Sequence, residues 1–177
     1  MKKKSKKKKK EEKKQEVKKQ EVKEKEYKYQ VMNKDLQKEA VEFHDKQVIF
    51  DVTLKNIGVL QWPKGKTKLI NDPKSDIKEK EINLADLQKD KDQKVKIQLN
   101  LANVKAGEKK CIYHFNVEGK NYGNPLILKV IMKEDENVVK LRNEFGLSEK
   151  DYDNAKLSDA LKKNKNDLSK AFESLFN

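Results

Sequence analysis

The spacing of apolar residues changes once along this chain, near residue 134, and that change limits the possible folds more than any other feature. Before it, apolar and polar residues alternate, as in Phe50, Val52 and Leu54 or across residues 94–101, KVKIQLNL. Alternation of period two is typical of a strand with one buried face. After residue 134 the apolar residues recur with helical spacing. We therefore predict a β-rich part followed by a helical part.

The β-rich part is predicted to contain six to eight strands with no helix between them. This pattern is typical of an all-β sandwich. Besides the two strands above, the expected strand segments are 27–31, 69–70, 77–82, 111–117 and 126–132. We expect the last segment to be covered on both faces, because it has apolar residues on both of them. Residues 119–125 read as a glycine-rich hairpin loop, and residues 32–45 as an irregular segment with Val41 and Phe43 pointing inward.

Helix boundaries are marked clearly after residue 134. Asp135 is a suitable N-cap, and Gly146 provides the left-handed stop. A second helix carries Leu157 and Leu161, and a third begins after Asp167 and is predicted to reach Phe176. Three short helices in this length predict a minimal three-helix bundle over residues 135–177, which would use nearly all of its apolar residues as core.

The turn after residue 54 leads to the single tryptophan, Trp62. The residues Asn56, Gly58 and Gly65 favour turns, since asparagine bonds its own backbone and glycine accepts positive φ. Trp62 fits a core position better than a ligand platform, because a sandwich needs large side chains between its sheets.

This stretch resembles the four-tryptophan domain of the "next to breast cancer gene one" selective-autophagy receptors, an immunoglobulin-like β-sandwich. That pattern is aromatic-x-x-x-Leu, Asn-x-Gly, then Trp-Pro-x-Gly. One tryptophan of the four is present, and Phe50 stands where the first would be. The resemblance implies an immunoglobulin-like domain over residues 27–134 that binds a cargo or partner protein. Its signature residues here are Phe50, Asn56, Gly58, Trp62, Pro63, Gly65, Tyr122 and Gly123.

The C-terminal segment resembles the ubiquitin-associated domain. Residues 156–176 match the second and third helices of that family without a gap, and Phe145-Gly146-Leu147 occupies the place of its Met-Gly-Phe loop, with about five extra residues before the second helix. The resemblance implies binding of ubiquitin or a ubiquitin-like protein through Phe145, Gly146, Leu147, Leu175 and Phe176. Here Gly146 would turn Leu147 outward. In the alternative interpretation, the aromatic residues and Leu147 simply close the small core.

The charge is placed unevenly. Of the net charge of +13, residues 1–26 contribute +8, and Arg142 is the one arginine among forty-three basic residues. We expect the lysine-rich tail, residues 1–26, to be disordered or helical. It could direct nuclear import or attract an acidic partner, or it could be a solvated tail. Lysine runs without arginine or interleaved aromatics argue against a nucleic-acid partner.

Several functional classes lack support in the sequence. The single cysteine, Cys111, cannot form an internal disulfide, and no apolar run is long enough for membrane insertion. His44 and His114 lack metal-ligand spacing to Cys111, and no catalytic or cofactor-binding motif is present. We therefore expect a non-enzymatic protein without metal or cofactor, located in the cytoplasm or, because of the lysine tail, the nucleus.

The leading hypothesis is a non-enzymatic adaptor in selective autophagy or ubiquitin-dependent protein handling. In it, the sandwich binds cargo and the helical part binds ubiquitin. The first alternative is a nuclear regulatory scaffold whose sandwich docks a transcription-related partner. The second is a cytoskeletal accessory protein whose tail binds acidic polymer surfaces.

Overall fold

The computed structural model describes residues 27–176, so the predictions made for the lysine-rich tail lie outside the described residues. The described residues form two compact units. The first contains residues 27–36, 50–97 and 111–128, and the second contains residues 37–49, 98–110 and 129–176. Several strands pass from one unit into the other, and the predicted domain boundary at residue 134 stays a prediction.

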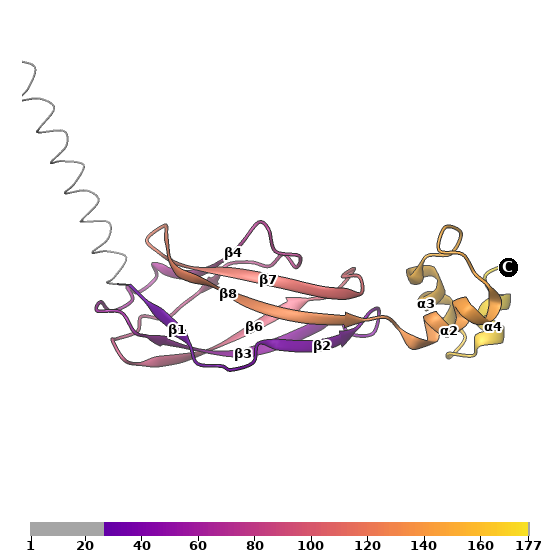
Figure 1. Ribbon diagram of the computed structural model, residues 1–177, viewed down its shortest axis with the longest axis horizontal. Coiled ribbons are helices and arrows are strands. Elements are labelled where there is room, and N and C mark those ends of the chain that lie inside the picture. Colours follow the sequence, from indigo (N-terminus) through magenta and orange to yellow (C-terminus); the bar gives the residue numbers. More distant parts are fainter. Residues whose placement is uncertain (1–26, 177) are drawn as a thin grey trace, which may run out of the picture. The chain divides into compact units, whose positions relative to one another are not determined.

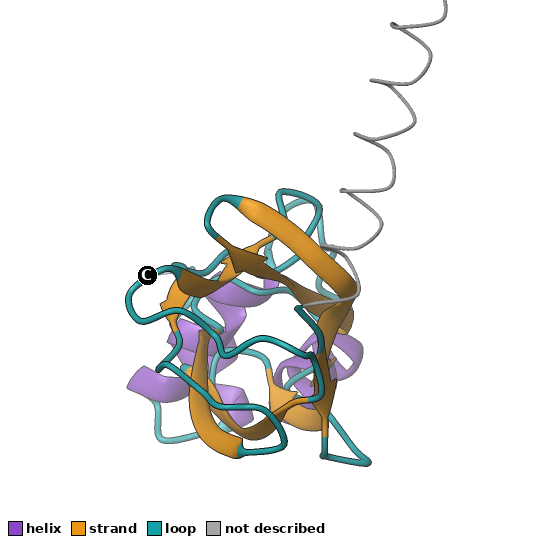
Figure 2. Cartoon of the chain, turned by 90° about the vertical axis from the view of Figure 1, so that its left-hand side faces the viewer, coloured by secondary structure: helices purple, strands orange, loops and turns teal. Residues whose placement is uncertain are grey.

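Eight strands, followed by helices, make the described chain mostly β-sheet, as the alternating pattern predicts (Figure 1). A three-stranded sheet has the order β1-β3-β6, and a five-stranded sheet has the order β2-β8-β7-β4-β5. The strands are β1 (Tyr29–Val31), β2 (Gln37–Val41), β3 (Gln47–Asn56), β4 (Thr67–Asn71), β5 (Ile82–Asn83), β6 (Asp92–Asn100), β7 (Gly107–Val117) and β8 (Lys120–Lys133). Figure 2 shows these strands from one end, with the loops that join them.

In the first unit, aromatic rings join the two sheets. The Tyr29 ring of β1 lies 4.8 Å from the Phe115 ring of β7, centroid to centroid, and the Trp62 ring also lies 4.8 Å from the Phe115 ring. Tyr29 also donates its hydroxyl hydrogen to the Asn124 carbonyl. The alternating residues of β3 and β7 are buried as predicted, with Val52 and Leu54 fully enclosed. These contacts are compatible with a β-sandwich.

The segment preceding β3 differs from the sequence-based expectation. Residues 37–41 form β2, which pairs in parallel with β8, so the prediction of an irregular segment is wrong there. Ala40 is buried, whereas Val41 and Phe43 are only half-buried. The register opposite β8 decides this, because Ala40 pairs with Met132 and the strand alternation then turns Val41 away.

Two other strand predictions need correction. Of segment 77–82 only Ile82 is in a strand, because pairing with β4 is limited to Ile82 and Asn83, although Ile77 is buried. Strand β8 is covered on one face and not on both, since Ile127 is 40% exposed between the buried residues Leu126 and Leu128.

The predicted glycine-rich loop is shorter than expected. β8 already begins at Lys120, so residues 120–125 belong to a strand and the turn consists of Glu118 and Gly119. Both have positive φ, 52° and 86°, as in a type I′ hairpin turn. A two-residue turn of this kind fixes the register of β7 and β8.

Three helices follow β8, all in the second unit. They are α2 (Glu136–Phe145), α3 (Asn154–Lys163) and α4 (Leu168–Glu173). The Asp135 carboxylate accepts from the Asn137 N–H at 2.9 Å, and Asp167 caps α4 through the Lys170 N–H at 3.0 Å. Gly146 ends α2 with φ of 64°. The predicted N-caps Asp135 and Asp167 and the stop at Gly146 are therefore confirmed.

The helices share an apolar cluster that includes Val138, Leu141, Leu157, Leu161 and Ala171. The predicted third helix is too long, because α4 ends at Glu173 and Phe176 lies beyond it. Ser174 explains the stop, since its hydroxyl donates to the Ala171 carbonyl at 2.8 Å and so competes with a further helical turn.

Candidate functional site

Four aromatic rings lie next to one another in the helical part of the chain. Phe145 of α2 stacks on Phe172 of α4, with ring centroids 4.2 Å apart and planes 11° apart. Phe176 meets Phe172 edge-on at 5.0 Å and Tyr152 at 6.0 Å. Phe176 remains 61% exposed, although the Phe172 and Tyr152 rings contact it. We call these four residues the aromatic surface.

Leu147 does not belong to this surface. The expectation that Gly146 turns Leu147 outward is wrong: Leu147 is 9% exposed and lies in the apolar cluster of the helices. The Leu147 N–H donates to the Arg142 carbonyl at 3.0 Å, which holds Leu147 against the C-terminal end of α2. A core this small depends on most of its large apolar residues, and Leu147 is one of those that fill it. Leu175 is half-buried against the same cluster.

Arg142 organises the connection between α2 and α3. Its guanidinium donates to the Leu147 carbonyl at 3.0 Å, the Tyr152 carbonyl at 2.8 Å and the Asn154 side-chain oxygen at 2.7 Å. A planar group with five N–H donors can reach three acceptors from one position, which a lysine ammonium cannot do. Sequence reasoning missed this role, although one arginine among so many lysines was the available signal.

The signature residue Asn56 is a buried structural element. Its side-chain amide donates to the carbonyls of Leu60 and Leu87, both at 2.9 Å, and its oxygen accepts from the Gly58 N–H at 2.9 Å. The Asn56 side chain therefore fixes the turn against the segment before β6. The expectation that Gly58 adopts positive φ is wrong. Gly58 is buried, and its N–H makes the hydrogen bond to the Asn56 side chain.

Trp62 and Phe50 lie inside the first unit. Trp62 is 0% exposed and Phe50 is 2% exposed, which confirms the prediction that Trp62 is a core anchor. The indole N–H of Trp62 has no hydrogen-bond partner among residues 27–176. Neither side chain has surface left for a partner protein.

The other signature residues shape turns and a close contact. The Pro63 carbonyl accepts from the Lys66 N–H at 3.2 Å, and Gly65 takes the positive φ of 70° that this turn requires. Gly123 has φ of 69°, and a Cβ there would lie 3.6 Å from the Tyr29 ring. Tyr122 is buried and contacts the Tyr27 ring at 5.3 Å. Binding of a partner by the β-rich part stays a prediction and would need other residues.

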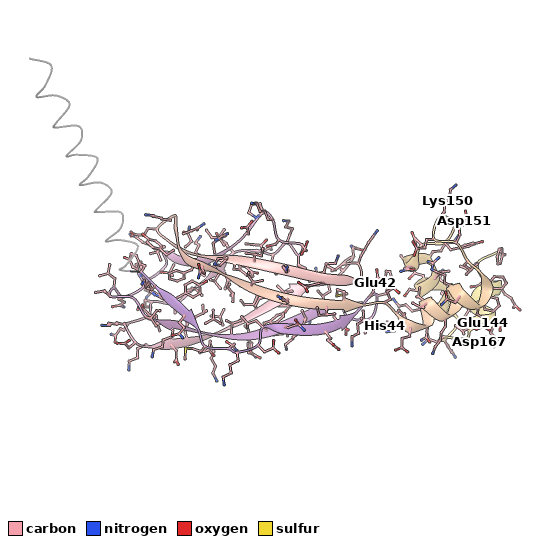
Figure 3. The ribbon with its side chains drawn as sticks, in the orientation of Figure 1. Glu42, His44, Glu144, Lys150, Asp151 and Asp167 are labelled. Carbon is pink, nitrogen blue, oxygen red and sulfur yellow. The ribbon has the colours of Figure 1, made fainter. Side chains whose placement is uncertain are left out.

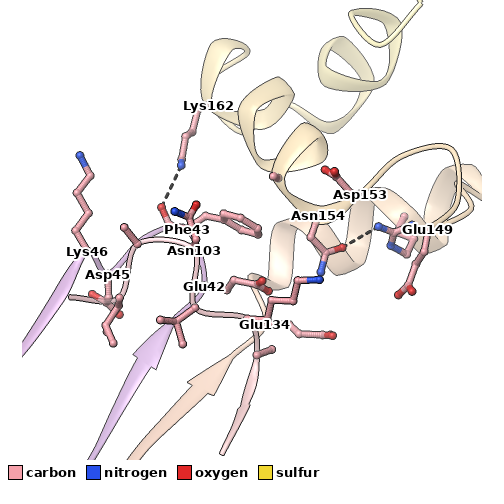
Figure 4. A pocket seen from close by; sticks show the side chains of 17 residues that line it. Glu42, Phe43, Asp45, Lys46, Asn103, Glu134, Glu149, Asp153, Asn154 and Lys162 are labelled. Atoms are coloured by element: carbon pink, nitrogen blue, oxygen red, sulfur yellow. Dashed lines mark hydrogen bonds between the residues drawn. The ribbon is translucent and has the colours of Figure 1, made fainter. Parts of the chain in front are cut away.

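A pocket of about 840 Å³ lies within the second unit (Figure 4). Both carboxylates and cations line it, among them Glu42, Glu134 and Lys162. Lys162 Nζ donates to the Phe43 carbonyl at 3.0 Å, and the lining residues include no Ser, Thr, Cys or His. The pocket therefore offers carboxylate and ammonium groups but no hydroxyl, thiol or imidazole side chain.

Glu42 is the most enclosed carboxylate of this pocket, with 6% of its surface exposed (Figures 3 and 4). Burial raises the pKa of Glu42, and the nearby Glu134 carboxylate raises it further. Hydrogen bonds from the Asn154 side chain and the Ala106 backbone act in the opposite direction and do not cancel the effect of burial. Glu42 therefore holds its proton more tightly in the folded chain than in the unfolded one.

This shift predicts a pH-dependent stability. The folded-state pKa of Glu42 lies above its unfolded-state pKa. The free energy of unfolding should therefore fall as pH rises from the unfolded-state pKa through the folded-state pKa. Glu42→Gln should flatten the slope, since the amide does not ionise. Urea unfolding at several pH values between about 4 and 7 measures this dependence of the free energy of unfolding on pH. Glu149→Gln, at an exposed position of the same pocket, is the control; equal slopes for the wild type and Glu42→Gln would contradict the prediction.

The two histidines and the cysteine pair with protein groups. His44 Nε2 lies 2.8 Å from Asp135 Oδ2, and His114 Nε2 lies 2.6 Å from Asp72 Oδ2. Cys111 is fully buried, and burial raises its pKa to about 11, so the reactive thiolate is scarce at neutral pH. Among residues 27–176, no group of three or more His, Cys, Asp or Glu side chains is arranged to hold a metal ion.

Comparison with known proteins gives no match, either to a protein-family model or to a curated protein. Within the described part of the chain, every helix is too short or too polar to cross a membrane.

Proposed function

We propose that this protein is a ubiquitin-binding adaptor, in which the aromatic surface contacts ubiquitin or a ubiquitin-like protein. The observation that carries the proposal is Phe176, which is 61% exposed although two aromatic rings, those of Phe172 and Tyr152, contact it. An exposed aromatic side chain on a rigid support is typical of a binding hot spot. The resemblance of residues 156–176 to ubiquitin-associated helices supports the same assignment.

The buried position of Leu147 changes which residues make the contact. Phe176 is the central contact in the proposal; Phe172 contacts it, and Phe145 stacks on Phe172. Gly146 is exposed at the neighbouring loop, where its backbone is accessible to a partner. Leu147 and Leu175 then act indirectly, because they hold the helices that carry the rings.

The β-rich part supplies the second binding function of the proposed adaptor. Its signature residues are committed to turns and core, so a cargo protein would contact exposed side chains between them. The process that fits both functions is selective autophagy or ubiquitin-dependent protein handling. The resemblance to the four-tryptophan domain supports this part of the proposal.

Phe176→Ala should weaken ubiquitin binding by about tenfold or more, because a truncated hot-spot aromatic removes most of its contact. The measurement is a titration of ¹⁵N-labelled ubiquitin with the full chain, followed by chemical-shift changes. Phe176 lies at the surface beyond α4, so the helical core should survive the substitution.

Val59→Ala is the matched control, since Val59 is a 66% exposed apolar residue in the other unit. It should leave the titration unchanged. If ubiquitin shows no shifts at millimolar concentrations of the wild-type chain, the proposal fails. Equal shifts with the wild type and Phe176→Ala would remove the aromatic surface from it.

A further inference from the structure

A long strand, β6, lies at the edge of the three-stranded sheet. The strands at the edges of the two sheets are β1, β6, β2 and β5, and of these β1, β2 and β5 have three, five and two residues. β6 has nine residues, and within the described part of the chain it pairs with β3 alone. An edge strand presents unpaired N–H and C=O groups, and folded proteins usually keep such strands short. β6 is therefore the edge of this fold that is best suited to pair with another chain.

Two backbone hydrogen bonds fix which groups of β6 face outward. The Asn56 N–H donates to the Lys91 carbonyl, and the Leu101 N–H donates to the Lys46 carbonyl, both at 2.9 Å. These bonds lie at the two ends of the β3–β6 pair, an even number of residues apart along each strand, so the ladder keeps one phase between them. The odd-numbered residues of β6 therefore bond to β3. The groups that point away from β3 include the N–H and C=O of Asp92, Lys94 and Lys96, and we call these three residues the β6 edge.

Two exposed lysines give the β6 edge its charge. Ile97, on the inner face of the same strand, is buried, whereas all three side chains of the β6 edge are exposed. Neither Lys94 nor Lys96 forms an ion pair or a side-chain hydrogen bond among residues 27–176. Like charges directly opposite each other destabilise a strand pair, so these lysines oppose pairing with a basic strand or with a second copy of β6. An acidic strand would bring the opposite charge to the same positions.

We infer that the β6 edge binds an extended acidic segment of a partner protein, which adds to the three-stranded sheet as a further strand. An extended peptide chain is the ligand that can pair with a row of N–H and C=O groups. Lys94 and Lys96 select acidic residues at alternate positions of that segment, and the residues between them face inward, next to the half-buried Val95. This inference is independent of the proposed ubiquitin contact, because the β6 edge belongs to the first unit and the aromatic surface to the second.

Two synthetic peptides test the inference with the full chain. One peptide alternates glutamate and valine, and the other alternates lysine and valine, so that both can form the same strand. Fluorescence anisotropy of the labelled peptides measures each Kd. The glutamate peptide should bind about tenfold more tightly than the lysine peptide, because only its charges attract the lysines of the β6 edge. Binding of neither peptide, or equal binding of both, would overturn the inference.

Variants of β6 separate backbone pairing from charge. Lys94→Pro removes an N–H that does not face β3, and proline is tolerated at such edge positions. It should weaken binding of the glutamate peptide about tenfold, since the missing donor interrupts the new strand pair. Lys94→Glu with Lys96→Glu leaves the backbone unchanged and should reverse the preference between the peptides. Lys64→Glu with Lys80→Glu changes the net charge equally at exposed positions of the same unit, and this control should keep the wild-type preference.

Amide hydrogen exchange, measured for each residue by NMR, tests the strand pairing directly. With the glutamate peptide bound, exchange at the Lys94 and Lys96 amides should slow, whereas the Val95 amide, which faces β3, should exchange as before. Wild-type affinity in a folded Lys94→Pro variant would overturn the inference, and circular dichroism shows whether that variant is folded. So would an unreversed preference in Lys94→Glu with Lys96→Glu, a lost preference in the control, or unchanged exchange at both lysines. The double glutamate variant decides the matter by itself if Lys94→Pro does not fold.

Discussion

Trp62→Ala is expected to lower the free energy of unfolding of the first unit by about 3–5 kcal/mol, the usual loss for a buried aromatic residue. Trp62 is 0% exposed and packs on Phe115 with ring centroids 4.8 Å apart, where Phe115 also contacts Tyr29 of the other sheet. Its removal therefore leaves a cavity at the point where the sheets meet. Guanidinium unfolding followed by far-UV circular dichroism measures the loss, because the variant lacks the fluorescent indole.

Trp62→Phe keeps an aromatic ring in the core and so tests how much of the loss in Trp62→Ala comes from removing the ring. The indole N–H has no partner among the described residues, so phenylalanine removes an unpaired buried donor while keeping much of the ring volume. We expect a loss of about 1–2 kcal/mol, clearly smaller than for alanine. Equal losses for Trp62→Ala and Trp62→Phe would contradict this account of the core.

Arg142→Met should destabilise the helices by about 2–4 kcal/mol, since hydrogen bonds from a charged donor contribute more than neutral ones. The substitution keeps a long apolar stem but removes the donors to Leu147, Tyr152 and Asn154. Faster amide hydrogen exchange throughout α2, α3 and α4 is the expected result, and the amides of the first unit provide an internal reference.

Two further variants of the same helix make this test specific. Lys140→Met removes a charge at an exposed position of α2 and should leave exchange unchanged. Arg142→Lys keeps the charge but not the planar fork, so it should behave almost like Arg142→Met. Wild-type protection in Arg142→Lys would show that charge alone, and not the three acceptors, explains the effect.

Much of the fold was predictable from local patterns. Alternation in residues 94–101 and 111–117 identified strands whose inward residues, such as Leu99 and Phe115, are buried. Capping residues Asp135 and Gly146 marked the limits of α2. Strand alternation and helix caps depend on a few neighbouring residues and not on distant parts of the chain, so the sequence alone was enough to predict them.

The sequence by itself determined that strands precede helices and which faces of the long strands turn inward, because side-chain period is a local property of the backbone. Only the tertiary structure decided that Ala40 faces inward from β2, since a parallel partner ninety residues away sets that register. Tertiary packing also buries Leu147 in the helical core and leaves Phe176 exposed, because the contacts among the three helices decide which of the few apolar side chains are enclosed. The exposure of the candidate binding residues therefore depends on long-range packing.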